Sequence, residues 1–216
     1  MYRPPAFRED RPEVLRDAIR THPLGTLVTA GSLGIVTSLL PFSIRCEPDG
    51  DVLCAHLAKG NRQIDELREQ PPTSVLFHGP QGYVSPSWYA TKREHGRVVP
   101  TWNFVVVQVW GTPTIRDDVQ WLREQIEELT NAAEKGFRMP WKVADAPEDF
   151  IQAQMKGIVG LEIPVSRIEG KRKLSQNQPD RNQAGVIAGL RETGQEALAD
   201  AVAEGRRQPD DFSLAK

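Results

Sequence analysis

Short runs of alternating apolar and polar residues recur along much of the chain, and such runs are typical of half-buried strands. Turn sequences such as AGSLG and EPDGD separate them. The pattern predicts six strands, at residues 24–29, 35–45, 52–57, 73–78, 102–110 and 159–165, with the fifth extended past Gly111 to Ile115.

Two of these strands depart from simple alternation. The fifth, WNFVVVQVW, is apolar at successive positions, which indicates burial on both faces, as in a barrel wall that also meets another subunit. Pro41 lies inside the second predicted strand and cannot donate a backbone hydrogen bond. It therefore marks a sheet edge, a bulge or a bend over a pocket.

Other segments have the three-to-four-residue apolar spacing of amphipathic helices. The predicted helices span residues 10–22, 62–70, 117–136 and 145–156. In the third, Asp117 is the predicted N-cap and Gly136 the stop signal. From residue 181 the chain is predicted to be helical, and its last segment, QPDDFSLAK, is expected to be poorly ordered.

Composition narrows the class of protein. The 216 residues suffice for one sizeable domain, and 27 basic against 29 acidic residues leave a formal charge of −2. Without a basic face or a helix-turn-helix pattern, the sequence argues against direct DNA binding. Cys46 and Cys54 are too few for a disulfide framework or a four-ligand metal site.

Nothing in the sequence indicates a membrane protein. No apolar run approaches the ~18 residues of a membrane span. The N-terminal MYRPPAFRED is neither an apolar signal core nor a basic amphipathic helix. We therefore expect a cytoplasmic protein.

The segment at residues 79–103, GPQGYVSPSWYATKREHGRVVPTWN, is unusually rich in side chains that bind planar ligands. Flat faces come from Tyr83, Trp88, Tyr89 and Trp102. Hydrogen-bonding groups come from Ser85, Ser87, Thr101 and Asn103. The segment predicts a binding surface, with an aromatic core corner or a dimer seam as the alternative.

A second candidate follows the third predicted strand, where Lys59 and Asn61 stand before a helix. Backbone N–H groups, the helix dipole and an ammonium all favour an anion such as a phosphate there. The alternative is an ordinary solvated helix start.

Motifs spread over residues 1–192 carry a family resemblance. They are MYRPPAF, HPLGTLVT, LPF, AHLAKGN, GPQGYVSPSWY, EHGRVVPTWN, DAPEDFI, IVGLEI and EGKRKLSQNQP. Together they resemble the PaiB-like family of FMN-binding negative transcriptional regulators. The resemblance implies an α+β fold, the FMN-binding split barrel: a six-stranded antiparallel Greek-key barrel with flanking helices. It also implies a homodimer with flavin at the subunit interface. We expect this domain at residues 1–192 and a C-terminal helical extension and tail at 193–216.

The resemblance also implies roles for individual residues. Lys59 and Asn61 match the region that seats the flavin phosphate. The implied pocket residues on the second strand are Thr37, Ser38, Pro41 and Phe42. Those in the SPSWY and VPTWN motifs are Ser85, Ser87, Trp88, Thr101, Trp102 and Asn103. The KLSQN match contributes Lys173, Ser175, Gln176 and Asn177.

The chain departs from the family at three positions. Leu39, Gln108 and Ala133 stand where family members commonly carry histidine. Any ligand function of the first of those histidines is missing or altered here.

Two classes of function remain open. The family name implies a flavin-binding regulatory protein that senses redox or metabolite state. The alternative is a small oxidoreductase or a haem enzyme in the same pocket, because some relatives resemble haem enzymes, including piperazate synthases. His56 and His95 are the candidate axial ligands for haem. The sequence identifies no catalytic residue.

Overall fold

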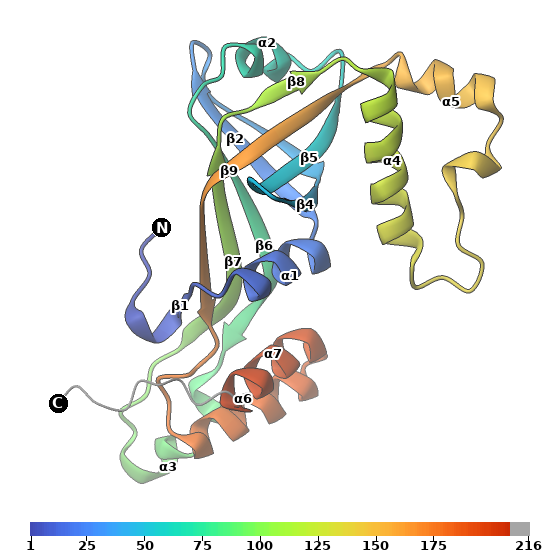
Figure 1. The fold of residues 1–216 in the computed structure, drawn as a ribbon. Helices are drawn as coiled ribbons and strands as arrows, with labels where there is room; N and C mark the ends of the chain where they lie inside the picture. Colours follow the sequence, from blue (N-terminus) through green and yellow to red (C-terminus); the bar gives the residue numbers. More distant parts are fainter. Residues whose placement is uncertain (208–216) are drawn as a thin grey trace. The chain divides into compact units, whose positions relative to one another are not determined.

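The structure, a computed structural model, describes residues 1–207 (Figure 1). The predicted disorder of residues 208–216 concerns a segment outside the described residues. The chain divides into two compact units. Pro12–Phe77 and Val107–Glu169 form the barrel unit, and Met1–Arg11, His78–Val106 and the chain from Gly170 form the terminal unit. Three strands run from one unit into the other: β6 (Thr73–Val84), β7 (Thr101–Gly111) and β9 (Ile158–Lys173).

A curled antiparallel sheet makes up the barrel unit. Its further strands are β2 (Leu24–Gly31), β3 (Gly34–Pro41), β4 (Ser43–Glu47), β5 (Gly50–Ala58) and β8 (Thr114–Arg116). The strand order is β3-β2-β6-β7-β9-β5-β4, with β8 paired to β9. β3 and β4 stand at opposite ends of this order, yet only Phe42 separates them in the sequence. The sheet therefore curls until its two ends approach each other.

The sequence predicted most of these strands, with three differences. The fifth predicted strand, extended to Ile115, is two strands, β7 and β8, with Pro113 between them. The predicted strand at 35–45 is two strands, β3 and β4, and the break follows Pro41, as the missing backbone donor of proline indicated. β6 and β9 extend well beyond the predicted 73–78 and 159–165, to Val84 and Lys173. Their extensions are polar and contain glycines, so they lack the alternation on which the prediction rests.

The barrel core lies on the inner face of the sheet. Leu27, Leu53 and Leu161 are fully buried there, and each contributes about 1.5–3 kcal/mol by burial. Phe42 and Phe77 meet edge to face, with ring centroids 5.6 Å apart. A Cβ at Gly25 would lie only 2.7 Å from the Phe77 side chain, so only glycine fits here.

Helices surround the barrel. α1 (Pro12–Thr21) buries Leu15 and Ile19 against it. α2 (Gln63–Arg68) is short, and α4 (Val119–Glu134) packs beside β4 and β5 (Figure 1). The turn η3 (Val143–Asp145) and α5 (Glu148–Met155) share a small core with α4. The N-cap of α4 is Asp118, which accepts from the Trp121 N–H at 2.6 Å, so the predicted cap Asp117 was wrong by one position.

The terminal unit is mainly helical. It contains η1 (Pro5–Phe7), β1 (Arg8–Glu9), η2 (Pro86–Trp88), α3 (Thr91–His95), α6 (Asp180–Glu192) and α7 (Glu196–Arg207). β1 pairs with the end of β9, and α6 and α7 lie side by side (Figure 1). Val84, Leu190 and Leu198 lie in its core. Across the described residues, no helix combines the length and apolar character needed to cross a membrane.

Candidate functional site

The residues implicated by sequence fall on both units. The barrel unit carries Thr37, Ser38, Pro41, Phe42, Lys59 and Asn61. The terminal unit carries Ser85, Ser87, Trp88, Thr101, Trp102, Asn103 and Lys173. Three cavities, two in the barrel unit and one in the terminal unit, account for six of these residues.

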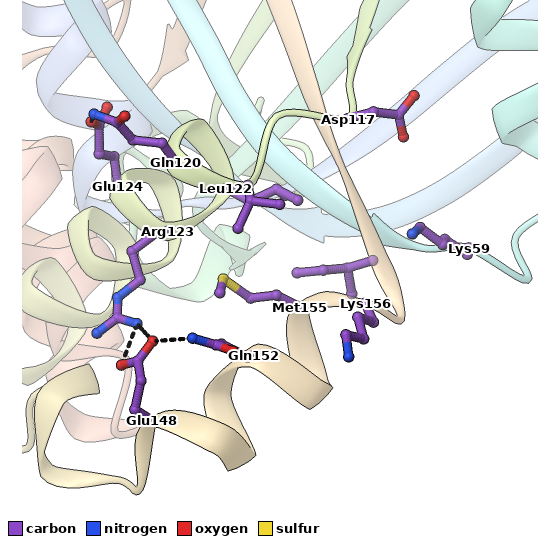
Figure 2. A pocket seen from close by; sticks show the side chains of 12 residues that line it. Lys59, Asp117, Gln120, Leu122, Arg123, Glu124, Glu148, Gln152, Met155 and Lys156 are labelled. Carbon is purple, nitrogen blue, oxygen red and sulfur yellow. Dashed lines mark hydrogen bonds and ion pairs between the residues drawn. The ribbon is translucent and has the colours of Figure 1, made fainter.

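The Lys59 cavity has a volume of about 760 Å³ and lies beside α4 and α5 (Figure 2). It is lined by Lys59, Asp117, Val119, Gln120, Leu122, Arg123, Glu124, Glu148, Gln152, Met155, Lys156 and Ile158. Lys59 directly follows β5, and its backbone N–H donates to the Gly157 carbonyl at 2.8 Å. In Figure 2, Leu122 and Met155 lie between Lys59 on one side and Arg123 and Glu148 on the other.

Some charged side chains of the Lys59 cavity form ion pairs and others do not. Arg123 donates to Glu127 at 2.8 Å and to both oxygens of Glu148 at 2.9 Å. These bonds raise the pKa of Arg123, and the Arg123 bond lowers the pKa of Glu148. Among the described residues, no protein group pairs with the ammonium of Lys59 or Lys156. Two free cations therefore border a partly apolar cavity.

Asn61 is already engaged inside the protein. Its Oδ1 accepts from the Gln63 N–H, and its Nδ2 donates to Ser38 Oγ, both at 2.9 Å. The side chain thus fixes the start of α2 to β3. Lys59 is the free charged group of the AKGN sequence.

The second cavity of the barrel unit, the His56 cavity, has a volume of about 600 Å³. Pro41, Phe42, His56 and Ala133 are among its lining residues. His56 Nδ1 lies 2.8 Å from Oε1 of Gln125, which is fully buried. The Gln125 Nε2 has no hydrogen-bond partner in the described structure.

Thr37, which the family resemblance implied as a pocket residue, lies exposed on β3.

In the terminal unit, much of the SPSWY motif serves packing and turn formation. A Cβ at Gly189 would overlap the Trp88 ring, so Trp88 packs directly on α6. Ser85 caps η2 by accepting from the Ser87 N–H at 3.2 Å, and Ser87 Oγ accepts from Lys92 at 3.0 Å. Trp102 is different, because 49% of it is exposed.

The Asn103 cavity of the terminal unit has a volume of about 160 Å³. Tyr89, Val99, Pro100, Thr101, Asn103, Lys173, Ser175, Asn177 and Gln178 line it. Lys173 donates to the Thr101 hydroxyl and, at 2.9 Å, to the Trp102 carbonyl. Burial and then the charge of Lys171 lower the pKa of Lys173.

Sequence reasoning missed Lys156 and Gln178, which line cavities, and Gln125, the buried partner of His56. Lys156 follows a helix far along the chain from Lys59, and only the fold brings the two near one cavity. Gln125 is an ordinary helix residue by sequence. The KLSQN match, in contrast, led directly to Lys173 and Ser175.

Solved structures identify the class of the fold. The FAD and heme binding protein from Mycobacterium smegmatis matches with a TM-score of 0.59 and 18% identity, over 84% of this chain and 80% of that one. The flavocytochrome Anf3 from Azotobacter vinelandii matches with a TM-score of 0.53 and 14% identity, over 77% and 69%. The chain is an α+β protein with the split-barrel fold, as the sequence predicted.

Sequence comparisons identify the family. The profile of the family described as "Putative FMN-binding domain" matches residues 1–167. An uncharacterised protein of Emericella nidulans is 35% identical, over 91% of this chain and 93% of its own length. The protease synthase and sporulation protein PAI 2 of Bacillus subtilis is 30% identical, over 88% and 89%. The chain belongs to this PaiB-like family of FMN-binding domains.

Proposed function

We propose that the protein binds FMN through its barrel unit and acts as a flavin-dependent regulatory or redox-sensing protein. The observation that carries the proposal is the unpaired Lys59 ammonium on a cavity of about 760 Å³. This volume lies within the ~300–1,000 Å³ of typical ligand sites. Family membership supports FMN as the ligand, and the M. smegmatis neighbour binds another flavin, FAD.

The residues of the Lys59 cavity suit the two ends of a flavin nucleotide. Lys59 and Lys156 offer charge-assisted hydrogen bonds to a phosphate. Leu122, Met155 and Ile158 offer apolar contact to a ring system. Bound flavin would supply electron-transfer chemistry, and the protein would supply its orientation and hydrogen bonds. Flavin contacts of Thr37, Trp88 and Trp102 remain predictions from the family motifs.

One observation favours the second candidate, a haem enzyme or small oxidoreductase. His56 lines a cavity of about 600 Å³, and Gln125 holds its Nδ1. Ligating histidines are usually oriented by such a partner on the other ring nitrogen. The M. smegmatis neighbour binds both FAD and heme.

We also propose a homodimer. In the sequence, the apolar strand that is now β7 suggested a subunit contact, whereas in the structure β3 supports one. Val107 and Val109 of β7 are buried within the single chain, so they need no partner. Ile35 and Leu39 on β3 are 77% and 62% exposed, and β3 is an end strand of the sheet. An exposed apolar edge strand is a site where another chain can pair with or cover the sheet.

We propose that regulation proceeds without direct DNA contact. The formal charge of the chain is −2, and non-specific DNA affinity depends on positive charges that neutralise phosphates.

The variant Lys59→Ala tests the flavin proposal. It removes a charge-assisted bond worth ~1.5–3 kcal/mol, so FMN binding should weaken about 10- to 100-fold. Riboflavin, which lacks the phosphate, should bind equally well to wild type and variant. Lys135→Ala, at an exposed lysine after α4, is the matched control. If Lys59→Ala keeps the full preference for FMN over riboflavin, the phosphate does not lie at Lys59.

A further inference from the structure

One face of the sheet in the terminal unit carries partly exposed aromatic rings. Successive residues of a strand point to opposite faces, and Val84 and Val105 lie in the core with α6 and α7. Tyr83 and Phe104, one residue before each valine, therefore point to the other face, as does Trp102, two residues before Phe104. Tyr83 and Trp102 are each about half exposed, and their ring centroids on the adjacent strands β6 and β7 are 6.3 Å apart.

A lysine without an anionic partner borders this aromatic face. Lys171 lies on β9, the strand next to β7. Its Nζ is 5.3 Å from the ring centroid of Phe104 and 5.4 Å from that of Tyr2, and it donates to the Tyr2 carbonyl at 3.1 Å. Tyr2 is itself largely exposed. Among the described residues, no carboxylate pairs with the Lys171 ammonium, so its charge is available to an anion.

The terminal unit is also the positive part of the chain. Basic residues outnumber acidic ones in this unit, whereas acidic residues outnumber basic ones in the barrel unit. The formal charge of −2 for the whole chain therefore conceals a positive terminal unit. Such an asymmetry between parts of one chain is typical of proteins that meet an anionic polymer or surface. Flat rings set into a sheet suit stacking on bases better than insertion into lipid.

The arrangement of these groups fits a nucleic-acid single strand. Trp102 and Tyr83 offer neighbouring rings, and stacking of bases on such rings is a main source of affinity for single strands. Phe104 lies about 7 Å along β7 from Trp102, which puts the Lys171 ammonium near the backbone of a strand that stacks on Trp102. A duplex keeps its base faces stacked on one another, and an open sheet face encloses little of a free nucleotide. The face therefore favours an extended strand over both.

We propose that this aromatic face binds single-stranded RNA, with bases stacked on Trp102 and Tyr83 and a backbone phosphate at Lys171. All of these residues belong to the terminal unit, so the inference does not depend on flavin binding in the barrel unit. It assigns Trp102 a ligand other than flavin. It also gives the proposed regulatory role a target that is not duplex DNA.

Fluorescence anisotropy of a labelled oligouridylate of about eight nucleotides, titrated with the full chain at low salt, tests the proposal. The oligouridylate should bind about tenfold or more tightly than duplex DNA of the same length, because the bases of the duplex are not free to stack on protein rings. Saturating FMN should leave this binding unchanged.

Aromatic variants locate the bases. Trp102→Ala should weaken oligouridylate binding about tenfold or more, since it removes a stacking face. Trp102→Phe keeps an aromatic ring and should retain most of the affinity. Trp141→Ala, at a similarly exposed tryptophan of the barrel unit, is the matched control and should bind like wild type.

A lysine variant locates the phosphate. For single strands, the logarithm of the affinity falls with the logarithm of the salt concentration by about 0.7 for each phosphate contact. Lys171→Met should reduce the slope by about this amount, and Lys135→Met, at an exposed lysine of the barrel unit, should not. Absence of oligouridylate binding, equal binding of duplex DNA, displacement of the oligonucleotide by FMN, full affinity in Trp102→Ala or an unchanged slope in Lys171→Met would overturn the proposal.

Discussion

Cys54 and Cys46 illustrate how strongly position controls side-chain chemistry. Cys54 is fully buried, and this burial raises the pKa of its thiol to about 12 despite the nearby Arg45. Cys46 is exposed. Because the thiolate is the reactive form, Cys54 should be inert at neutral pH.

We therefore expect one rapidly labelled thiol per folded chain when a thiol reagent is added at pH 8, and labelling of the second only in denaturant. Cys46→Ser should remove the fast reaction. Rapid labelling of both thiols in the folded protein would show that the Cys54 strand opens readily.

His56 separates the flavin and haem proposals. It lines the His56 cavity and not the Lys59 cavity, so His56→Ala should change FMN affinity by less than about threefold, under ~1 kcal/mol. The variant leaves the buried Gln125 without its partner and should lower the free energy of unfolding by ~1–3 kcal/mol. Thermal unfolding without ligand measures this loss. If haemin gives wild type a Soret band that His56→Ala abolishes, haem becomes the leading cofactor.

The cap of α4 gives a paired test of helix energetics. Asp118 accepts from the Trp121 N–H, so Asp118→Ala should destabilise the protein by about 1 kcal/mol. Asp117 instead pairs with Arg68 at 3.1 Å on the surface, where such pairs contribute ~0–1 kcal/mol. Asp117→Ala is therefore the milder control, measured by chemical denaturation. Equal losses of stability in the two variants would show that Asp118 is not the N-cap of α4.

Helices and strands were predictable wherever apolar residues recurred at a regular spacing in the sequence. The barrel strands and the amphipathic helices α1 and α4 were predicted, and Pro41 indicated the break between β3 and β4. The extension of β9 to Lys173 was not predicted, because RIEGKRK has no alternating pattern. Strand pairing holds this polar segment, and pairing is a long-range property that a local pattern cannot show.

The candidate sites were predictable only in part. Family motifs indicated Lys59, Asn103 and Lys173, each of which lines a cavity. The motifs did not distinguish binding from packing, and Trp88 packs on Gly189 of α6. Cavity boundaries depend on residues such as Lys156 and Gln178, which reach these cavities only through the fold.

Assembly is the next property to test. If β3 forms the dimer contact, light scattering should give the mass of two chains, and Ile35→Lys combined with Leu39→Lys should give that of one. Two charges in an apolar interface are strongly unfavourable. Asn131→Lys, at an exposed polar position of α4, should leave the mass unchanged. A monomeric wild type would contradict the homodimer.

Flavin binding itself is tested most directly by one spectrum. The purified protein is incubated with FMN, separated from free ligand by gel filtration, and its visible absorption recorded. We predict a pair of flavin bands that elute with the protein and are much weaker when riboflavin replaces FMN, because the phosphate at Lys59 is then missing. A protein fraction without flavin absorption, or with a Soret band in its place, would contradict the proposed function.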